Sequence, residues 1–360
     1  MRDFLRVARY SLVKAILLGF AVVVAVFITI LIVNMGGRLD DIRKQEILNQ
    51  VALQVTANPA YQELPPSEVR RIIEEKAQLE YRRLGLDKPF LVRTAAYLKN
   101  AITLNLGRSE NLLSDTMSRE VRRIIIERLP STLILFGTSS ILLFFTAVFL
   151  ALALSRHYGS WFDRLVVSLA PTSTAPGWFY GIFLILIFAA VLRILPFGGM
   201  VDAPPPKETG AYILSLLKHM ILPVLSMFVG GLASSVYSWR TFFLIYSSED
   251  YVELAKAKGL SGRTIERRYI LRPTLPPIIT SFTLMVIGMW LGAIILESVF
   301  NWPGMGSLYI AAVNSNDTPT VVGINVIYGY LLAGSVFFLD FVYALVDPRV
   351  RIGAGEKKGV

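Results

Sequence analysis

The stretch STLILFGTSSILLFFTAVFLALAL occupies residues 131–154 and contains no charged side chain. A helix needs about 20 mostly apolar residues to cross the hydrocarbon core of a membrane, so this stretch predicts one spanning helix. Comparable apolar runs predict five further spans, at residues 11–33, within 163–192, and at 219–239, 281–300 and 321–346. We therefore predict an all-α integral membrane protein with six transmembrane helices.

The run at residues 163–192 is long for one straight helix, and it contains Pro171 and Pro176 followed by Gly177. Membrane helices tolerate such breaks where neighbouring helices satisfy the freed backbone groups. We expect a broken or tilted span here. The run at residues 11–33 is longer than the roughly 7–15 apolar residues of a signal peptide, so we expect it to be a retained span.

The composition of the chain supports a membrane protein. Of its 360 residues, 54% are hydrophobic and 17% are charged, whereas soluble domains usually carry about 25% charged residues. The chain has no cysteine and only two histidines, His157 and His219. Cysteine-based metal sites and disulfides are therefore excluded, and we expect no metal site.

The net charge of +10 would suit nucleic-acid binding, but the positions of the charges indicate membrane topology instead. Lys and Arg gather in four segments that share one side if the spans alternate: residues 2–9, 156–164, 240–272 and 349–358. Basic loops face the cytoplasm, which predicts cytoplasmic N- and C-termini and no nucleic-acid partner. The loop at residues 34–130 is also basic, but long loops cross membranes largely regardless of charge.

The first polar segment, residues 34–130, is expected to be extracytoplasmic and helical. Ser67 can cap a helix over residues 68–84, and Gly85 can end it. A second helical stretch follows Pro89. Two interpretations remain open: a small cap on the outer membrane surface, or a platform where an external partner docks.

The second polar segment, between the fourth and fifth spans, reads SSEDYVELAKAKGLSGRTIERRYILRP over residues 247–273. Acidic residues open its first helical stretch and lysines close it, as the helix dipole favours. Gly259 can adopt the left-handed conformation that ends a helix. Ser261 can cap a second helix, which we expect to end near Pro273. The pattern predicts a helix, a tight turn and a helix, serving either as a solvated loop or as a rigid element that binds a cytoplasmic partner.

This segment resembles the coupling loop of ABC importer permeases, the EAA loop, which spans residues 247–280 here. Glu253, Ala255 and Gly259 match its signature spacing, whereas Leu254 replaces the first alanine. The resemblance assigns contact with the ATPase to a small set of residues, namely Asp250, Glu253, Ala255, Gly259, Leu260, Ser261 and Arg268. Glu253 would bind the ATPase, Gly259 would set the turn, and the fourth and fifth spans would act as levers.

Other stretches resemble the dipeptide and oligopeptide permeases within this family. They lie, in the family's order, at residues 84–89, 105–109, 195–199, 297–306 and 347–351. The chain departs from the family after the first span, where Met35-Gly-Gly-Arg stands in place of a Pro-Gly-Asp-Pro run.

The resemblance implies a permease subunit in a prokaryotic cell membrane, forming half of a pathway for di- and oligopeptides. Its implied partners are a second homologous permease, two cytoplasmic ATPase subunits, an extracytoplasmic solute-binding protein and the lipid bilayer. The chain lacks a Gly-x-x-x-x-Gly-Lys-Ser/Thr phosphate loop. We therefore expect no enzymatic activity and no cofactor in this chain, with ATP and Mg²⁺ bound by the ATPase subunits.

Ionisable side chains inside spans are candidates for a transport pathway. Glu297 and Asp340 are the two candidates here, and an interhelical hydrogen bond or an interfacial position is the simpler interpretation of both.

The predicted organisation has four parts. They are an N-terminus with the first span (1–33), the extracytoplasmic segment (34–130), the permease core with the coupling loop (131–346), and a cytoplasmic tail (347–360). The alternatives are import of oligosaccharides or nickel chelates by the same kind of transporter, a secondary transporter, and a membrane-embedded enzyme.

Overall fold

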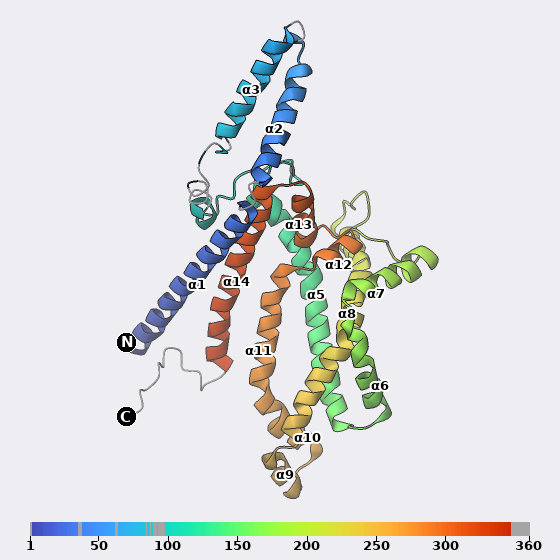
Figure 1. The fold of residues 1–360 in the computed structure, drawn as a ribbon. Helices are drawn as coiled ribbons and strands as arrows, with labels where there is room; N and C mark the ends of the chain where they lie inside the picture. Colours follow the sequence, from blue (N-terminus) through green and yellow to red (C-terminus); the bar gives the residue numbers. More distant parts are fainter. Residues whose placement is uncertain are drawn as a thin grey trace.

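A computed structural model describes residues 2–34, 38–61, 64–83, 85–86, 88, 92 and 98–346. The described residues form helices and no strand, with one isolated bridge between Arg108 and Glu120 (Figure 1). In chain order the elements are α1 (Arg2–Asn34), α2 (Arg38–Thr56), η1 (Pro59–Tyr61), α3 (Pro66–Arg83), α5 (Val121–Arg156), α6 (Trp161–Leu169), η2 (Ala170–Thr174), α7 (Gly177–Leu184), η3 (Ile185–Val191), α8 (Thr209–Ser247), α9 (Asp250–Ala257), α10 (Gly262–Thr264), η4 (Ile265–Leu271), α11 (Arg272–Gly288), η5 (Met289–Leu291), α12 (Ile294–Val299), α13 (Met305–Asn314) and α14 (Thr318–Val346).

Five helices in the described part of the chain are long and apolar enough to cross a membrane, and a bent pair makes a sixth. The bent pair joins residues 161–174 to 177–191 at an angle of 96°. The bend lies where Pro171 and Pro176 predict a broken span. Pro171 lies in the first turn of η2, and Pro176 is the N-cap residue of α7. The all-α membrane fold is therefore confirmed.

The fifth span is displaced from its predicted position. The helix that contains this span runs over residues 262–288, whereas the predicted span was 281–300. It does not end near Pro273, because seven residues of π-helix in η4 lead directly into α11. Proline has no backbone N–H to donate within a helix. Pro273 lies just after a π-helical stretch, where the regular hydrogen-bond pattern is already interrupted, so the missing donor does not end the helix. The chain then leaves the helix at Gly292, whose φ is +63°.

Helix α5 organises the bundle. It begins at Val121, ten residues before the predicted span, because Val121, Ile124 and Ile125 pack against α13 and α14. Its middle packs with α7, α8 and α12, and its last turns pack with α6, α8 and α11. Helix α5 therefore contributes side chains to three apolar clusters along its length.

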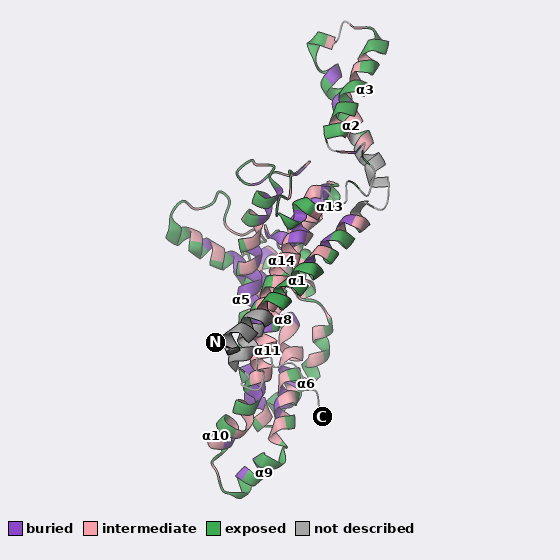
Figure 2. Cartoon of the chain, turned by 90° about the vertical axis from the view of Figure 1, so that its left-hand side faces the viewer, coloured by how far each residue is buried: buried purple, intermediate pink, exposed green. Residues whose placement is uncertain are grey.

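Helix α1 lies along α14 at the edge of the bundle, where Val22, Val26 and Ile30 pack around Val326. The opposite face of α1 is apolar and exposed, with Ile16 and Leu17 among the residues about 60% exposed (Figure 2). Exposed aliphatic side chains over a span of this length are suited to contact with lipid.

Helices α7 and α8 approach closely through two glycines. A Cβ atom built on Gly230 would lie 2.9 Å from the Cα atom of Gly177. Small residues permit such backbone contact between membrane helices. Alanine at position 230 would therefore force the two helices apart.

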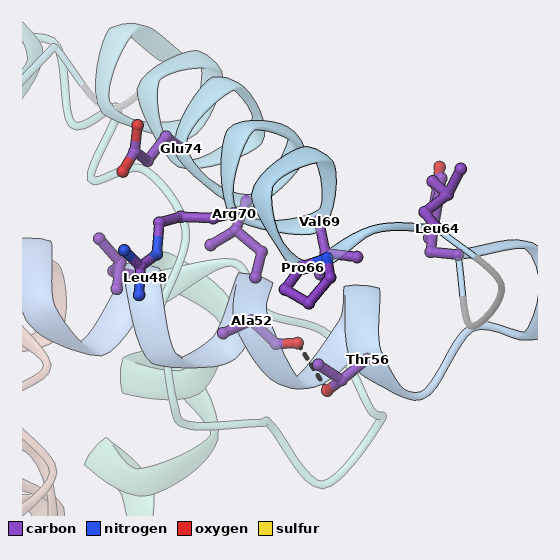
Figure 3. A pocket seen from close by; sticks show the side chains of 10 residues that line it. Leu48, Ala52, Thr56, Leu64, Pro66, Val69, Arg70 and Glu74 are labelled. Carbon is purple, nitrogen blue, oxygen red and sulfur yellow. Dashed lines mark hydrogen bonds between the residues drawn. The ribbon is translucent and has the colours of Figure 1, made fainter.

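Helices α2 and α3 form a hairpin that projects from one end of the bundle, and α9 and α10 lie at the opposite end (Figure 1). The Tyr81 hydroxyl of α3 donates to the Lys44 carbonyl of α2 at 2.8 Å. Between the two helices lies an open groove of about 570 Å³ (Figure 3). The predicted end of α3 is confirmed, because Gly85 has a φ of +70°. Most of the stretch predicted to be helical after Pro89 lies outside the described residues.

Candidate functional site

The polar segment between the fourth and fifth spans folds as predicted into a tight hairpin, here called the Gly259 hairpin (residues 250–271). Helix α9 ends at Ala257, and Gly259 has a φ of +71°. The Gly259 amide donates to the Lys256 carbonyl at 2.9 Å, and the Leu260 amide donates to the Ala255 carbonyl at 3.3 Å. This pair of bonds is the Schellman motif that closes a helix on a left-handed residue.

A small apolar core holds the Gly259 hairpin together. Val252 and Ala255 of α9 and Ile265 of η4 are buried against one another, and Leu260, Tyr269 and Ile270 pack around them. Ala255, which the resemblance assigned to ATPase contact, is 1% exposed and points into this core. The alanine position therefore stabilises the hairpin from inside.

The outer face of α9 carries a mixed acidic and apolar surface. Asp250 and Glu253 are exposed, and the exposed fraction is 38% for Tyr251 and 57% for Leu254. Burial and the nearby Glu249 carboxylate raise the pKa of Tyr251 above its usual value. Ser261 and Arg268 are also exposed. This face combines charged hydrogen-bonding groups with apolar area, as protein-binding surfaces do.

Glu297 lies outside the apolar spans, in α12, and its carboxylate is fully buried. Oε1 accepts a hydrogen bond from the Thr132 hydroxyl at 2.8 Å, and Oε2 accepts from the Ser307 amide at 2.9 Å. Thr132 also accepts from the Met305 amide at 2.7 Å. The carboxylate therefore joins α5 to the first turn of α13, where the helix dipole favours a negative group.

The surroundings of this carboxylate leave no room for additional side chains. A Cβ atom on Gly304 would lie 2.5 Å from the Glu297 carboxylate, and one on Gly306 would lie 3.0 Å from Oε2. The buried Trp302 indole donates to the Ser131 carbonyl at 2.9 Å. The structure thus places Glu297 in an interhelical hydrogen-bond network, the simpler of its two interpretations. Its role in a transport pathway stays a prediction, and the side chain of Asp340 in α14 lies outside the described residues.

Asp317 forms a second buried network that sequence reasoning missed. Oδ1 accepts from the Thr320 amide at 3.1 Å and so caps α14. Oδ2 accepts from the Ser109 hydroxyl and from the amides of Glu110 and Asn111, at 3.1 and 3.0 Å. This network forms part of the wall of a cavity of about 710 Å³, which the α2–α3 hairpin also lines. Asp317 followed by Pro319 is a helix-start signal that could have revealed the cap.

Replacing Asp317 by alanine is expected to release the loop at residues 109–112 from α14. The change leaves several partly buried amides without an acceptor, at a cost of about 1–3 kcal/mol for each group that stays unpaired. Hydrogen exchange in the assembled complex should become faster across this loop. Asp115→Ala is the matched control, because it removes only an exposed pair with Arg128. Equal exchange in the two variants would contradict the assignment.

A third missed feature is the connection between α5 and α6, called here the α5–α6 corner (residues 156–163). The Arg240 guanidinium of α8 forms a bidentate pair with the Asp163 carboxylate, with Nη2 to Oδ2 at 2.7 Å. Both side chains are buried. The Tyr158 ring lies 5.0 Å from the guanidinium, and the Gly159 amide donates to Asp163 at 2.9 Å. A buried pair with these additional partners is well satisfied.

Within the described residues, no group of three or more His, Asp or Glu side chains could hold a metal ion. The arrangement has an exposed face of mixed charged and apolar side chains on α9 at one end of the bundle, the Asp163–Arg240 network near that end, and the Glu297 and Asp317 networks toward the other.

Comparisons with known proteins agree with this arrangement. A family model described as a binding-protein-dependent transport system inner membrane component matches residues 124–352. A probable D,D-dipeptide transport system permease protein of Escherichia coli (strain K12) is 32% identical over 300 residues, covering 76% of this chain and 84% of the relative. An oligopeptide and a dipeptide transport system permease protein of Bacillus subtilis (strain 168) are each 28% identical, covering 75% and 76% of this chain and 83% and 82% of the relatives.

The apolar helices and the polar hairpin between two of them define a multi-pass membrane protein. The chain belongs to the family of binding-protein-dependent transport system inner membrane components. It is a permease subunit of an ABC importer.

Proposed function

We propose that the chain forms half of the translocation pathway of an importer for di- and oligopeptides, beside a second homologous permease. Two cytoplasmic ATPase subunits would bind ATP and Mg²⁺ and supply the energy, and an extracytoplasmic solute-binding protein would deliver the peptide. The printed names of the relatives, which are dipeptide and oligopeptide permeases, support the substrate class.

The proposed orientation has the Gly259 hairpin and both chain termini in the cytoplasm and the α2–α3 hairpin outside the cell. Support comes from the basic segments at residues 2–9, 156–164, 240–272 and 349–358. Further support comes from the arrangement in Figure 1, where α1 begins and α14 ends toward the end that carries α9. This topology is consistent, because it places the basic segments and the proposed ATPase-binding hairpin on the same side of the membrane.

The observation that carries the proposal is the division of α9 into a buried and an exposed face. Val252 and Ala255 fix the helix to the hairpin, and Tyr251, Glu253 and Leu254 point outward. An exposed apolar residue such as Leu254 beside carboxylates is suited to a groove on a protein partner. We infer that this face lies in a groove of the ATPase subunit and passes its movements to α8 and α11.

Cysteine cross-linking tests the contact, because the chain has no cysteine of its own. Leu254→Cys in the assembled transporter is expected to cross-link to an ATPase subunit. Met117→Cys, which is 77% exposed and lies far from α9 in the sequence, is the control and should not. The absence of any cross-link from position 254 would contradict the proposal.

Uptake assays test the substrate. Reconstituted transporter with its binding protein should accumulate a labelled tripeptide, and unlabelled dipeptides should compete. Accumulation of oligosaccharides or nickel chelates in place of peptides would contradict the proposed substrate class, but it would still agree with an ABC importer.

A further inference from the structure

The α5–α6 corner contacts both chain segments that flank α9. Helix α8 leads into the Gly259 hairpin, and its Arg240 binds Asp163 of the corner. The π-helix η4 leads out of α9, and its Glu266 binds Arg156 of the corner. A connection far earlier in the sequence is therefore attached both to the helix that precedes the hairpin and to the second arm of the hairpin.

The two ion pairs differ in their surroundings. Asp163 and Arg240 are 2% and 8% exposed, so this pair fixes the corner to α8 as one rigid unit. The Glu266 side chain is 13% exposed, and the Arg156 side chain is 51% exposed. Surface pairs contribute little to stability on average, so this second pair is suited to position η4 against α5 more than to stabilise the fold.

Apolar packing joins the same elements beneath the ion pairs. Leu154 at the end of α5, Val166 of α6 and Phe243 of α8 belong to one buried cluster. Ile270 and Leu271 of η4 pack against it. A contiguous set of packed and paired side chains is what transmits displacement from one helix to the next.

We propose that the α5–α6 corner is a third lever of the transporter, and that Arg156 and Glu266 are the positioning residues that make it follow the Gly259 hairpin. The inference rests on the proposed function of the hairpin as the ATPase-binding element. Movement of the hairpin would then displace α5 and the broken span α6–α7 together with α8 and α11. Because α5 packs along the whole bundle, its displacement would reach the Glu297 network at its other end.

Charge exchange tests the positioning role. Arg156→Glu and Glu266→Arg, each alone, place like charges together and should lower peptide uptake per ATP hydrolysed by about 2- to 30-fold, the range found for residues that couple distant sites. The double variant restores opposite charges and should recover most of this ratio. Equal ratios in all four proteins, or a double variant no better than the single ones, would overturn the inference. Membrane levels of each assembled complex control for folding.

Distance measurements separate this inference from the function on which it rests. Spin labels on the assembled transporter would pair Met117→Cys with either Lys258→Cys in the hairpin or Trp161→Cys in α6, all exposed positions. Trapping the ATPases with ATP and vanadate should change both distances in the parent and in the double charge exchange. In either single variant, the change in the distance to position 258 should persist, whereas the change in the distance to position 161 should become smaller, because the corner is then held to α8 alone.

The possible outcomes have distinct meanings. If neither distance changes in the parent, the proposed function fails. If position 258 moves and position 161 does not, or if position 161 moves as far in the single variants as in the parent, the third lever fails and the proposed function stands.

Discussion

Replacing Glu297 by alanine is expected to remove most of the assembled transporter from the membrane. The buried carboxylate is the acceptor for the Thr132 hydroxyl and the Ser307 amide. Without it, one buried and one partly buried donor lose their partner, at about 1–3 kcal/mol each, and the missing atoms leave a cavity that adds to the loss. An effect of this size is a large fraction of the stability of a typical domain, which is about 5–15 kcal/mol.

Thermal unfolding of the purified complex, followed by size-exclusion chromatography, would measure this loss. Ser298→Ala is the matched control, because Ser298 is exposed and its hydroxyl binds only the Ile294 carbonyl of its own helix at 2.9 Å. A Glu297→Ala complex as stable as the parent would contradict the structural role. Glu297→Gln retains the shape and one acceptor, so normal stability with altered uptake in that variant would place Glu297 in the substrate pathway.

Replacing Gly259 by valine is expected to abolish peptide uptake while the ATPase subunits continue to hydrolyse ATP. A side chain at the left-handed φ of +71° costs about 1–2 kcal/mol, and β-branched residues rarely adopt this conformation. The hairpin would relieve the strain by changing its turn, and the Ala255 and Lys256 carbonyls would lose their partners. The outer face of α9 would then no longer be aligned with its groove.

Gly262→Val provides the control for this change. Gly259 and Gly262 both have open space where a Cβ would lie, but only Gly259 has a positive φ. Parallel measurements of uptake and ATP hydrolysis should therefore show uncoupling in Gly259→Val and near-normal coupling in Gly262→Val. Normal uptake in Gly259→Val would contradict the mechanism.

Features that depend on local sequence could be predicted. Apolar runs predict every span except the fifth close to its observed place, Pro171 and Pro176 predict the break in the third one, and Gly259 predicts the hairpin turn. Each of these rests on a backbone preference or on hydrophobicity over neighbouring residues. Helix α2 lies in the segment predicted to be helical, but its bounds were not predicted, because its mixed composition lacks a clear apolar stripe.

Features that depend on distant partners could not be predicted. Nothing near Asp163 in the sequence indicates that Arg240 will bury beside it, and nothing near Asp317 indicates the amides of residues 110 and 111. The fifth span was displaced for a related reason. Whether a helix ends at Pro273 depends on the π-helix before it, which the tertiary packing of η4 against α9 helps to hold.

The Gly259 hairpin keeps the side chains that hold it together and the side chains of its proposed contact surface at different positions of one short helix. Residues 252 and 255 belong to the buried core of the hairpin, whereas the side chains of residues 251, 253 and 254 are exposed. If the proposed contact holds, a permease of this design could be fitted to a different ATPase by substitutions on the exposed face of the hairpin, with no change to the membrane-embedded helices.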